Sequence, residues 1–311
     1  VFDLTGASYR LHMVDVGTGL ALILEGPDML LVYDGGSQDD RRSGPNNRFL
    51  AYFRARLAGR TRIDHLILSH AHRDHVQLLP DLFDAFEVGE VWDSGAGNCT
   101  AGYRAFLDAV ADEPGVSFHN AIEGFATHTV VFDDQICDEP DDPPISISFQ
   151  ADSRIDSQSI DLGPGASLTF LYADATLHHD PNENTLVARL ELNGRVILLM
   201  GDAEAGARRL PASPPDPGSI EATLLDCCAA ALEADVMVVG HHGSLTSSRD
   251  AFIDVVGAQH FLISSGPKRY SGTPLPDPEI VTALEARGTV WRTDFDDAAC
   301  RTSPDKIGSD A

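Results

Sequence analysis

The chain has 311 residues, of which 43% are hydrophobic, so it is long enough to bury the core of one large α/β domain or two small ones. Its 48 acidic residues outnumber 22 Lys and Arg and give a formal charge of −26, which argues against a protein that binds long nucleic acids through their phosphates. The acidity fits an adaptation to solubility or salt, and it also allows a small anionic substrate held by metal ions, because a bound dication dominates its local field.

The composition also bears on location. No run of about 18 apolar residues appears, which argues against a membrane span. The N-terminus VFDLTGASYR lacks the pattern of a signal peptide, although a chain that starts with Val is compatible with a removed leader. The five cysteines have no C-x-x-C spacing and predict neither a disulfide framework nor a cysteine zinc site. Cys227 and Cys228 are interpreted as buried apolar filler, and a reducing, cytoplasmic location is favoured. Nothing in the pattern indicates an oligomeric state.

The first half of the chain begins with β-structure. Three short apolar runs, over residues 9–17, 20–26 and 29–36, are separated by Gly, Pro and Asp turn signals, which is typical of a meander. Apolar periodicity then predicts, in turn, a helix, a strand covered on both faces, a helix, a strand and a helix, over residues 46–59, 63–69, 76–86, 87–95 and 102–112.

The second half begins after a segment of different composition. Residues 133–165 are rich in Asp, Pro and Ser, which predicts a loop or insertion that leans over the site. Strands are then expected over residues 167–173, 184–192 and 194–202, followed by alternating helices and strands over residues 220–234, 235–240, 248–258, 260–266, 277–288 and 289–294. Two strand-rich halves with helices predict a layered α/β sandwich, as one domain over residues 1–297 with a C-terminal tail over residues 298–311.

A dense group of metal-competent side chains follows the apolar strand in LILSHAHRDHVQLLPDLF, residues 66–83: His70, His72, Asp74 and His75. Composition alone would produce His-x-His-x-Asp-His about twice in a thousand such chains, so chance is a weak explanation. In extended backbone His70 and His72 point the same way and can bind one ion. Asp74 and His75 can turn towards a second ion, at the separation of ~3.5–4 Å that two-metal hydrolases use.

SHAHRDH resembles the signature of the metallo-β-lactamase fold. Other segments resemble the branch seen in the extracellular domain of ComEC/Rec2 competence proteins and in phosphorylcholine esterases, and they occur in the family's order over residues 14–26, 30–36, 93–110, 182–202 and 234–248. The resemblance spans about residues 10–297. It implies a four-layer αββα sandwich and a metal-dependent hydrolase with two divalent ions.

The metal ligands that the resemblance implies are, in chain order, His70, His72, Asp74, His75, Asp202, His241 and His242. The first two would bind one ion, the next two a second ion, and Asp202 both ions. Either His241 or His242 would complete the second site and the other would contact substrate or leaving group, a choice that sequence order leaves open. Asp74 and this His pair are the expected catalytic residues. Asp34 is expected to orient a ligand loop, or to form the turn before two glycines.

The chain departs from the family pattern in two places. The third nitrogen expected for the first metal is missing, and the matching region ATLHHDPNENTL offers only His178, His179 and Asn184, so manganese would be permitted as readily as zinc. In SSGPKRYSGTPLPD, the branch's Tyr-Gly-His-Pro stretch keeps Tyr270 and Pro274 but lacks the His.

Four residues are expected to contact substrate: Asn184, Ser244, Lys268 and Tyr270. Ser244 begins a run of hydroxyl residues before the helix at 248–258, which would cap that helix or help it to cradle a phosphate. Lys268 and Arg269 form a rare basic pair that would clamp an anion, or a solvated loop.

These observations predict a phosphodiesterase. A water held between two zinc or manganese ions has its pKa lowered to about 7, so it supplies a hydroxide nucleophile at neutral pH. The reaction then needs no Ser or Cys nucleophile. The same hydroxide would serve a carboxylic ester, thioester or lactam hydrolase, and a non-catalytic module that binds a ligand through the same fold is the third alternative.

Overall fold

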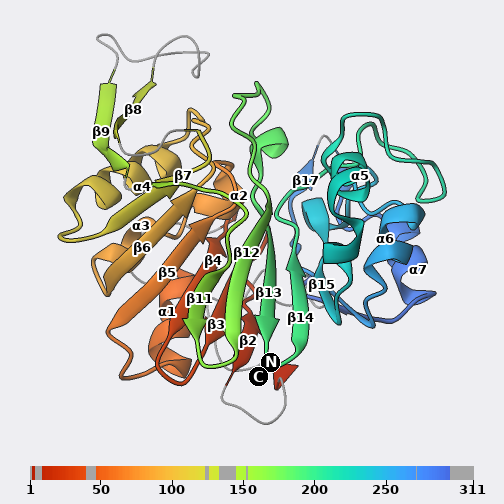
Figure 1. Cartoon of the computed structure of the whole chain (residues 1–311), viewed down its shortest axis with the longest axis horizontal. Helices are drawn as coiled ribbons and strands as arrows, with labels where there is room; N and C mark the ends of the chain where they lie inside the picture. The colour runs from red at the N-terminus through yellow and green to blue at the C-terminus, as the bar shows by residue number, and fades with distance from the viewer. Residues whose placement is uncertain are drawn as a thin grey trace.

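Two β-sheets face each other, and helices cover the outer face of each (Figure 1). The computed structural model describes residues 2–3, 9–39, 47–122, 126–132, 145–151, 153–270 and 272–294. The expected tail over residues 298–311 lies outside the described residues. The order of layers, helices, sheet, sheet and helices, confirms the predicted four-layer αββα sandwich.

In the described part of the chain, the first sheet has eight strands in the order β1-β2-β3-β4-β5-β6-β7-β10. Their bounds are Phe2–Asp3, Arg10–Met13, Ala21–Glu25, Leu30–Gly35, Arg62–Leu68, Glu87–Asp93, Ser117–Asn120 and Ser153–Arg154. Strands β2, β3 and β4 form the predicted antiparallel meander. Strands β4 to β7 pair in parallel, so their carboxyl ends lie at one edge of the sheet.

The second sheet, over the same described residues, has seven strands in the order β11-β12-β13-β14-β15-β16-β19. Their bounds are Ile160–Gly163, Ala166–Tyr172, Val187–Leu192, Arg195–Leu199, Val236–Val238, His260–Ile263 and Thr289–Arg292. Strands β14, β15, β16 and β19 are parallel. Two short antiparallel pairs stand apart, β8 (Ala126–Phe132) with β9 (Ile145–Ala151) and β17 (Arg269–Tyr270) with β18 (Thr273–Pro274).

Three apolar clusters hold the layers together. One packs α1 and α4 against the first sheet, the middle one lies between the sheets, and the third packs α5, α6 and α7 against the second sheet. The α-helices α1 to α7 span Arg48–Arg56, Arg73–Val76, Pro80–Phe83, Ala101–Asp112, Ile220–Leu232, Asp250–Val256 and Pro278–Glu285, and the 3₁₀ helices η2 and η3 span Pro181–Asn184 and Gly240–Gly243. Strand β5 is buried on both faces, as its apolar run predicts. Leu66 and Leu68 belong to the cluster under α1 and α4, whereas Ile67 between them belongs to the cluster between the sheets.

Two sequence expectations need correction. The helix expected over residues 76–86 is two short helices, α2 and α3, because Pro80 starts the second one and has no N–H with which to continue the first. The segment 133–165, expected to be a loop or an insertion, is not all loop, because it contains β9, β10 and β11. Weak periodicity hid these strands, since they are short or paired outside the main sheets. Residues 133–144 and 152 lie outside the described residues.

The interpretation of the cysteines is wrong. Cys227 and Cys228 are joined by a disulfide, Cys227 is exposed, and the backbone at Cys228 (φ −137°, ψ 19°) interrupts helix α5. Cys99 is disulfide-bonded as well. These bonds remove the argument for a reducing compartment, because disulfides persist in oxidising ones. None of the helices in the described residues has the length and apolarity needed to cross a membrane.

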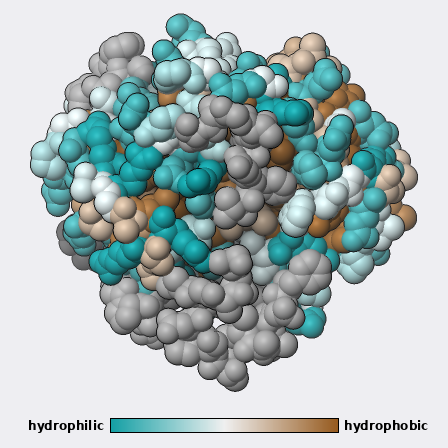
Figure 2. Space-filling view, turned by 90° about the horizontal axis from the view of Figure 1, so that it is seen from below, coloured by the Kyte–Doolittle hydropathy of each residue, from teal (hydrophilic) through white to brown (hydrophobic). Residues whose placement is uncertain are grey.

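Figure 2 shows the molecule from below, which is the end opposite the carboxyl edge of the parallel strands in Figure 1. Hydrophilic residues are spread over both sides of this view, with smaller hydrophobic patches between them. The parallel strands of both sheets terminate at the other end of the molecule, which is where functional side chains are expected in α/β folds.

Candidate metal centre

The predicted ligands come together at the carboxyl ends of three parallel strands. His70 follows β5, Asp202 follows β14, and His242 follows β15. In Figure 1 this edge lies in the upper middle of the molecule, near α2 and β17. An apolar strand that ends abruptly in a polar ligand is therefore the local signal that positions each half of the centre.

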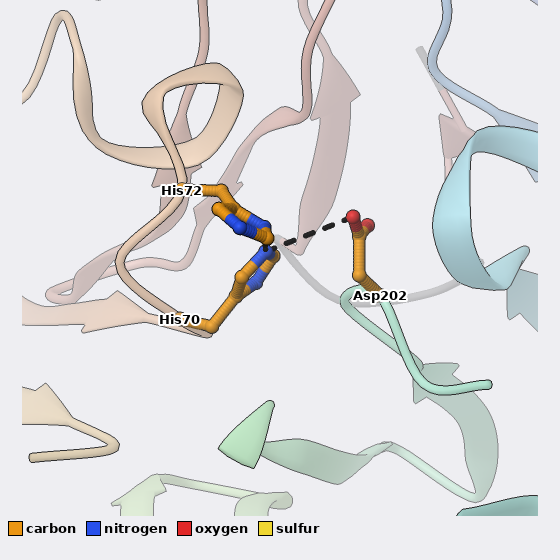
Figure 3. A group of neighbouring side chains, drawn as sticks. All are labelled: His70, His72 and Asp202. Carbon is orange, nitrogen blue, oxygen red and sulfur yellow. Dashed lines mark hydrogen bonds and ion pairs between the residues drawn. The ribbon is translucent and has the colours of Figure 1, made fainter. Parts of the chain in front are cut away.

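The first group of ligands consists of His70, His72 and Asp202, whose ligand atoms lie within 4.8 Å of one another. His70 Nε2 is 3.0 Å from His72 Nδ1 and 3.7 Å from Asp202 Oδ2. Figure 3 shows the two imidazoles close together on one loop and the Asp202 carboxylate facing them from another segment. His70 and Asp202 are buried, whereas His72 is only half-buried.

The second group consists of Asp74, His75 and His242, all buried, with ligand atoms again within 4.8 Å. His75 Nε2 lies 3.3 Å from His242 Nε2, and His242 Nε2 lies 3.5 Å from Asp74 Oδ2. The Ser264 carbonyl accepts a hydrogen bond of 2.7 Å from His242 Nδ1. Because a carbonyl can only accept, Nδ1 carries the proton and Nε2 presents its lone pair to the group.

Asp202 lies between the two groups and turns one oxygen to each. Its Oδ2 is 3.7 Å from His70 Nε2, and its Oδ1 is 3.1 Å from His75 Nε2 and 3.7 Å from His242 Nε2. Gly201 makes this approach possible, because a Cβ there would collide with Thr185 Oγ1 and Ser69 and its φ is +52°. The Thr185 hydroxyl in turn accepts from the Asp202 backbone N–H at 3.1 Å.

His241 and His242 are adjacent, yet they lie on different sides of Asp202. Both adopt left-handed backbone, with φ of 47° and 52°. His242 joins the second group, whereas His241 Nε2 lies 3.8 Å from Asp202 Oδ2, the oxygen that faces the first group. The His241 side chain is 21% exposed and belongs to neither group of three.

The electrostatics of the centre fit divalent metal ions. Burial lowers the pKa of His75, but the Asp202 and Asp34 carboxylates outweigh it and raise that pKa well above its usual value. Burial and the neighbouring His75 lower the pKa of His70 well below its usual value. Asp202 Oδ1 is buried and makes no hydrogen bond to any described residue. A cation between this oxygen and the two Nε2 atoms would satisfy it, and imidazole with carboxylate suits Zn²⁺, Mn²⁺ and Fe²⁺.

Asp34 lies beneath the candidate ligands and contacts residues of both groups. It is fully buried, accepts from the Ser69 backbone N–H and hydroxyl at 2.7 Å each, and lies 2.7 Å from His75 Nδ1. The Ser69 hydroxyl, which donates to Asp34, lies 3.0 Å from His70 Nδ1. One carboxylate thus orients a histidine of each group, directly for His75 and through Ser69 for His70.

Of the four expected substrate contacts, Tyr270 and Lys268 lie near the second group. The Tyr270 hydroxyl donates to Asp74 Oδ2, and burial together with Asp74 raises the pKa of Tyr270. Lys268 Nζ lies 5.3 Å from the Tyr270 ring centroid and donates to Gln38 Oε1 at 2.7 Å. Arg269 is exposed.

Asn184 and Ser244 are both engaged by hydrogen bonds to other residues of the chain. The Asn184 amide donates to the Thr176 carbonyl at 2.7 Å and accepts from the His178 backbone N–H at 2.9 Å, which does not support a substrate contact. Ser244 Oγ accepts from Arg208 Nη1 at 3.0 Å.

The replacements expected for the missing third nitrogen are not in the first group either. His178 Nε2 lies 2.9 Å from Asp174 Oδ2, and neither His178 nor His179 belongs to a ligand group among the described residues. The hydroxyl residues before α6 do not cap it, since its N-cap is Arg249 without a side-chain cap. Glu221 instead accepts from the backbone N–H groups of Ser248 and Arg249.

Sequence reasoning missed Glu204 and Asn182 near His241, and it did not place Thr246, one of the hydroxyl residues before α6, beside that ring. Glu204 Oε1 and Thr246 Oγ1 each lie 2.7 Å from His241 Nδ1, and Asn182 Nδ2 donates to Glu204 Oε1 at 3.5 Å. Glu204 could have been found as the second carboxylate in MGDAE, two residues after Asp202. Asn182 could not be told from Asn184 by sequence.

The chain is similar to several solved structures. YhfI from Bacillus subtilis, a metallo-β-lactamase fold protein, is 12% identical, with 93% of this chain and 95% of that chain covered and a TM-score of 0.47. Tm1679, a metal-dependent hydrolase of the β-lactamase superfamily, is 14% identical, with 91% and 95% covered and a TM-score of 0.45. CmlA, a diiron β-hydroxylase from Streptomyces venezuelae, is 13% identical, with a TM-score of 0.45; the alignment covers 93% of this chain and 53% of CmlA, about half its length.

Among curated proteins, none matches the sequence significantly. The family model of the metallo-β-lactamase superfamily matches residues 14–266, a span that contains every ligand of both groups. Because this match covers well over half of the sequence, the chain belongs to the metallo-β-lactamase superfamily.

Proposed function

We propose that the protein is a metal-dependent hydrolase that cleaves phosphodiesters. Two divalent ions, zinc or manganese, would be held by the two groups of ligands: His70, His72, Asp74, His75, Asp202 and His242. The observation that carries this proposal is that both groups share Asp202, which turns Oδ2 to the first group and Oδ1 to the second. A shared carboxylate is what brings two cations close enough to act on one substrate atom.

When bound, the two dications lower the pKa of a water between them to about 7 and draw charge from the bond that is cleaved. The chain's own residues do the positioning. Asp202 sets the spacing of the groups, and Ser264 holds His242 with its Nε2 towards them. On the side of the second group, the Tyr270 hydroxyl donates a hydrogen bond to Asp74 Oδ2. On the other side, the half-buried His241 ring offers a nitrogen to the substrate or the leaving group.

Two features favour phosphoryl over carbonyl chemistry. A pair of cations suits a phosphoryl group, whose transition state spreads negative charge over several oxygens. The order of the motif segments also favours the branch of the ComEC/Rec2 domains and the phosphorylcholine esterases, which we propose for this chain. With a formal charge of −26, a small anionic phosphodiester is favoured over long nucleic acid.

The test compares three substrate classes on one preparation. The protein, loaded separately with zinc and with manganese, is assayed on bis-p-nitrophenyl phosphate, on a p-nitrophenyl carboxylic ester and on a chromogenic lactam. We expect the phosphodiester to be cleaved with the highest kcat/KM, and Asp74→Ala and Asp202→Ala to abolish this activity. Asp112→Ala, which removes an exposed carboxylate from α4, is the matched control and should be unchanged.

Other results would point to the other classes of function. A faster reaction with the ester or the lactam, lost in the same two variants, would assign carbonyl chemistry to the centre. Two bound metal equivalents without turnover of any substrate would indicate a ligand-binding module.

A further inference from the structure

His241 lies on the open side of the first group, and its ring is held from behind. Its Nδ1 atom lies 2.7 Å from Glu204 Oε1, and its Nε2 atom points the other way, to within 3.8 Å of Asp202 Oδ2. Glu204 follows Asp202 by two residues, so the turn after β14 delivers both carboxylates, one to each nitrogen of the same ring.

The hydrogen bonds around Glu204 determine where the ring proton lies. A carboxylate only accepts, so a contact of 2.7 Å requires the hydrogen on His241 Nδ1. Thr246 Oγ1 lies 2.7 Å from the same nitrogen and donates its own hydrogen to Ser244 Oγ at 3.1 Å. Both neighbours of Nδ1 therefore act as acceptors, and Nε2 is the atom left to act on what binds in front of it.

Asn182 holds Glu204 from the other side. Its Nδ2 donates to Glu204 Oε1, and its Oδ1 is buried with no hydrogen-bond partner within the described ranges. Turning the amide over would bring Oδ1 against the carboxylate, so this orientation is the favourable one. The Glu204 side chain thus receives hydrogen bonds from two residues that are far apart in sequence.

We infer that Glu204 is a positioning residue of the centre, which keeps the proton on Nδ1 of His241 and aims Nε2 at the substrate beside the first group. The inference rests on the proposed function, since it names the residue that prepares the substrate-facing histidine of that site. His241 lies outside both groups of three, and the metal content of the His241→Ala protein tests whether it binds metal.

Substitution of the Glu204 side chain leaves the main-chain framework in place. The contact of this segment with α5 is made by the Glu204 carbonyl, which accepts from the Glu221 backbone N–H at 3.1 Å. Loss of the carboxylate therefore removes the contact to His241 without removing the bond to the helix.

The first measurement is a double-mutant cycle on bis-p-nitrophenyl phosphate. We expect His241→Ala to lower kcat by about 100-fold and Glu204→Ala by about 10- to 100-fold, with KM nearly unchanged. The double variant should be no slower than His241→Ala, because Glu204 acts only through that ring. Glu204→Gln should stay within about 5-fold of wild type, since its amide oxygen still accepts from Nδ1–H. Glu285→Ala, an exposed carboxylate on α7, is the matched control.

The second measurement does not depend on turnover. In the zinc-loaded protein with ¹⁵N-labelled histidine, NMR should show His241 with its hydrogen on Nδ1 in wild type and Glu204→Gln, and a mixture of tautomers in Glu204→Ala. Metal content should remain that of wild type in Glu204→Ala and His241→Ala.

The inference is overturned if the two losses in kcat multiply, if the tautomer is unchanged in Glu204→Ala, or if His241→Ala loses one metal equivalent, which would make His241 a ligand. If wild type cleaves no phosphodiester, the proposed function fails on its own. The tautomer then still decides the inference: dependence on Glu204 supports it, and independence overturns it.

Discussion

The two ligand groups that share Asp202 differ in how firmly the rest of the chain holds them. In the second group all three ligands are buried, His75 is held by Asp34 at 2.7 Å, and His242 is held by the Ser264 carbonyl at 2.7 Å. The main chain of Asp74 is held as well, because its carbonyl accepts from the Leu20 N–H at 3.0 Å.

The first group has fewer supports. Ser69 holds His70 at 3.0 Å, but His72 is half-buried, and its loop is braced from outside by Asn98, which donates to the Ala71 carbonyl at 3.1 Å. Partners that orient a ligand commonly change metal affinity by about 10- to 100-fold. The centre should therefore hold two ions of unequal affinity, with the more labile ion beside the open side that His241 faces.

The largest expected effect removes what the two groups share. Asp202→Ala should release both metal equivalents and lower the phosphodiesterase kcat/KM by on the order of 10⁴-fold, because each ion loses a ligand. Elemental analysis after gel filtration and the phosphodiester assay measure this, with Asp112→Ala alongside. Retention of one full metal equivalent would show that Asp202 does not serve both groups.

The next effect concerns Asp93, which ends β6 just before the loop that carries Asn98. Burial raises the pKa of Asp93 to about 7, so the folded protein keeps a proton that the unfolded chain releases from its usual pKa of 3.8 upwards. Protonated Asp93 therefore stabilises the folded state fully below the usual pKa of 3.8, and this stabilisation is lost as the pH rises through about 7. Asp93→Asn should therefore gain up to about 4 kcal/mol of unfolding free energy relative to wild type between pH 4 and pH 8.

Urea unfolding of wild type and Asp93→Asn at several pH values measures this difference. Because only the difference between the two proteins is used, titration elsewhere cancels. A difference that stays constant with pH would mean that the support next to the first group is not pH-sensitive.

The groups can also be compared through one histidine of each. His242→Ala should weaken the tighter ion by more than about 100-fold, whereas His72→Ala should weaken only the labile ion and leave one equivalent bound after dialysis against a chelator. Competition with a zinc indicator measures both affinities. If His72→Ala removed the tighter ion instead, the ranking of the groups would be reversed.

The smallest effect tests the support beneath the ligands. Asp34 has a φ of 58°, which Asn tolerates, so Asp34→Asn should keep the backbone while placing an amide against the Ser69 and His75 donors. We expect the tighter ion to bind about 10- to 100-fold more weakly. The labile ion should change less, since Asp34 reaches His70 only through Ser69. An equal change in both affinities, measured with the same indicator, would contradict the comparison.

The strands and the ligands that end them were predictable because both signals are local. The run before His70 and the run before Asp202 are apolar over the length of one strand, and the ligand comes at the abrupt end of each. Parallel neighbours then place such ends at one edge, which brings together residues more than a hundred positions apart.

The roles of His241 and His242 were not predictable, because they depend on two successive left-handed residues that turn the side chains to different sides. The choice between Asn182 and Asn184 also depends on local backbone geometry. Both lie in the short 3₁₀ helix η2, where the Asn184 amide bonds within its own loop and the Asn182 amide faces Glu204. Cys227 and Cys228 misled for a related reason, since an apolar neighbourhood in sequence does not say whether that face of a helix is buried.

The amino-acid sequence by itself therefore determined a layered α/β sandwich, the positions of most strands along the chain and the candidate ligands His70, His72, Asp74 and His75, because these follow from periodicity and from side-chain chemistry. The resemblance to a family added the αββα order of layers and the candidate role of Asp202. Only the tertiary structure decided that His242 and not His241 joins the second group and that the Glu204 carboxylate lies behind His241. It also decided how unequally the rest of the chain supports the two groups. Those facts are hydrogen bonds between segments remote in the chain, and their geometry exists only once both sheets have packed.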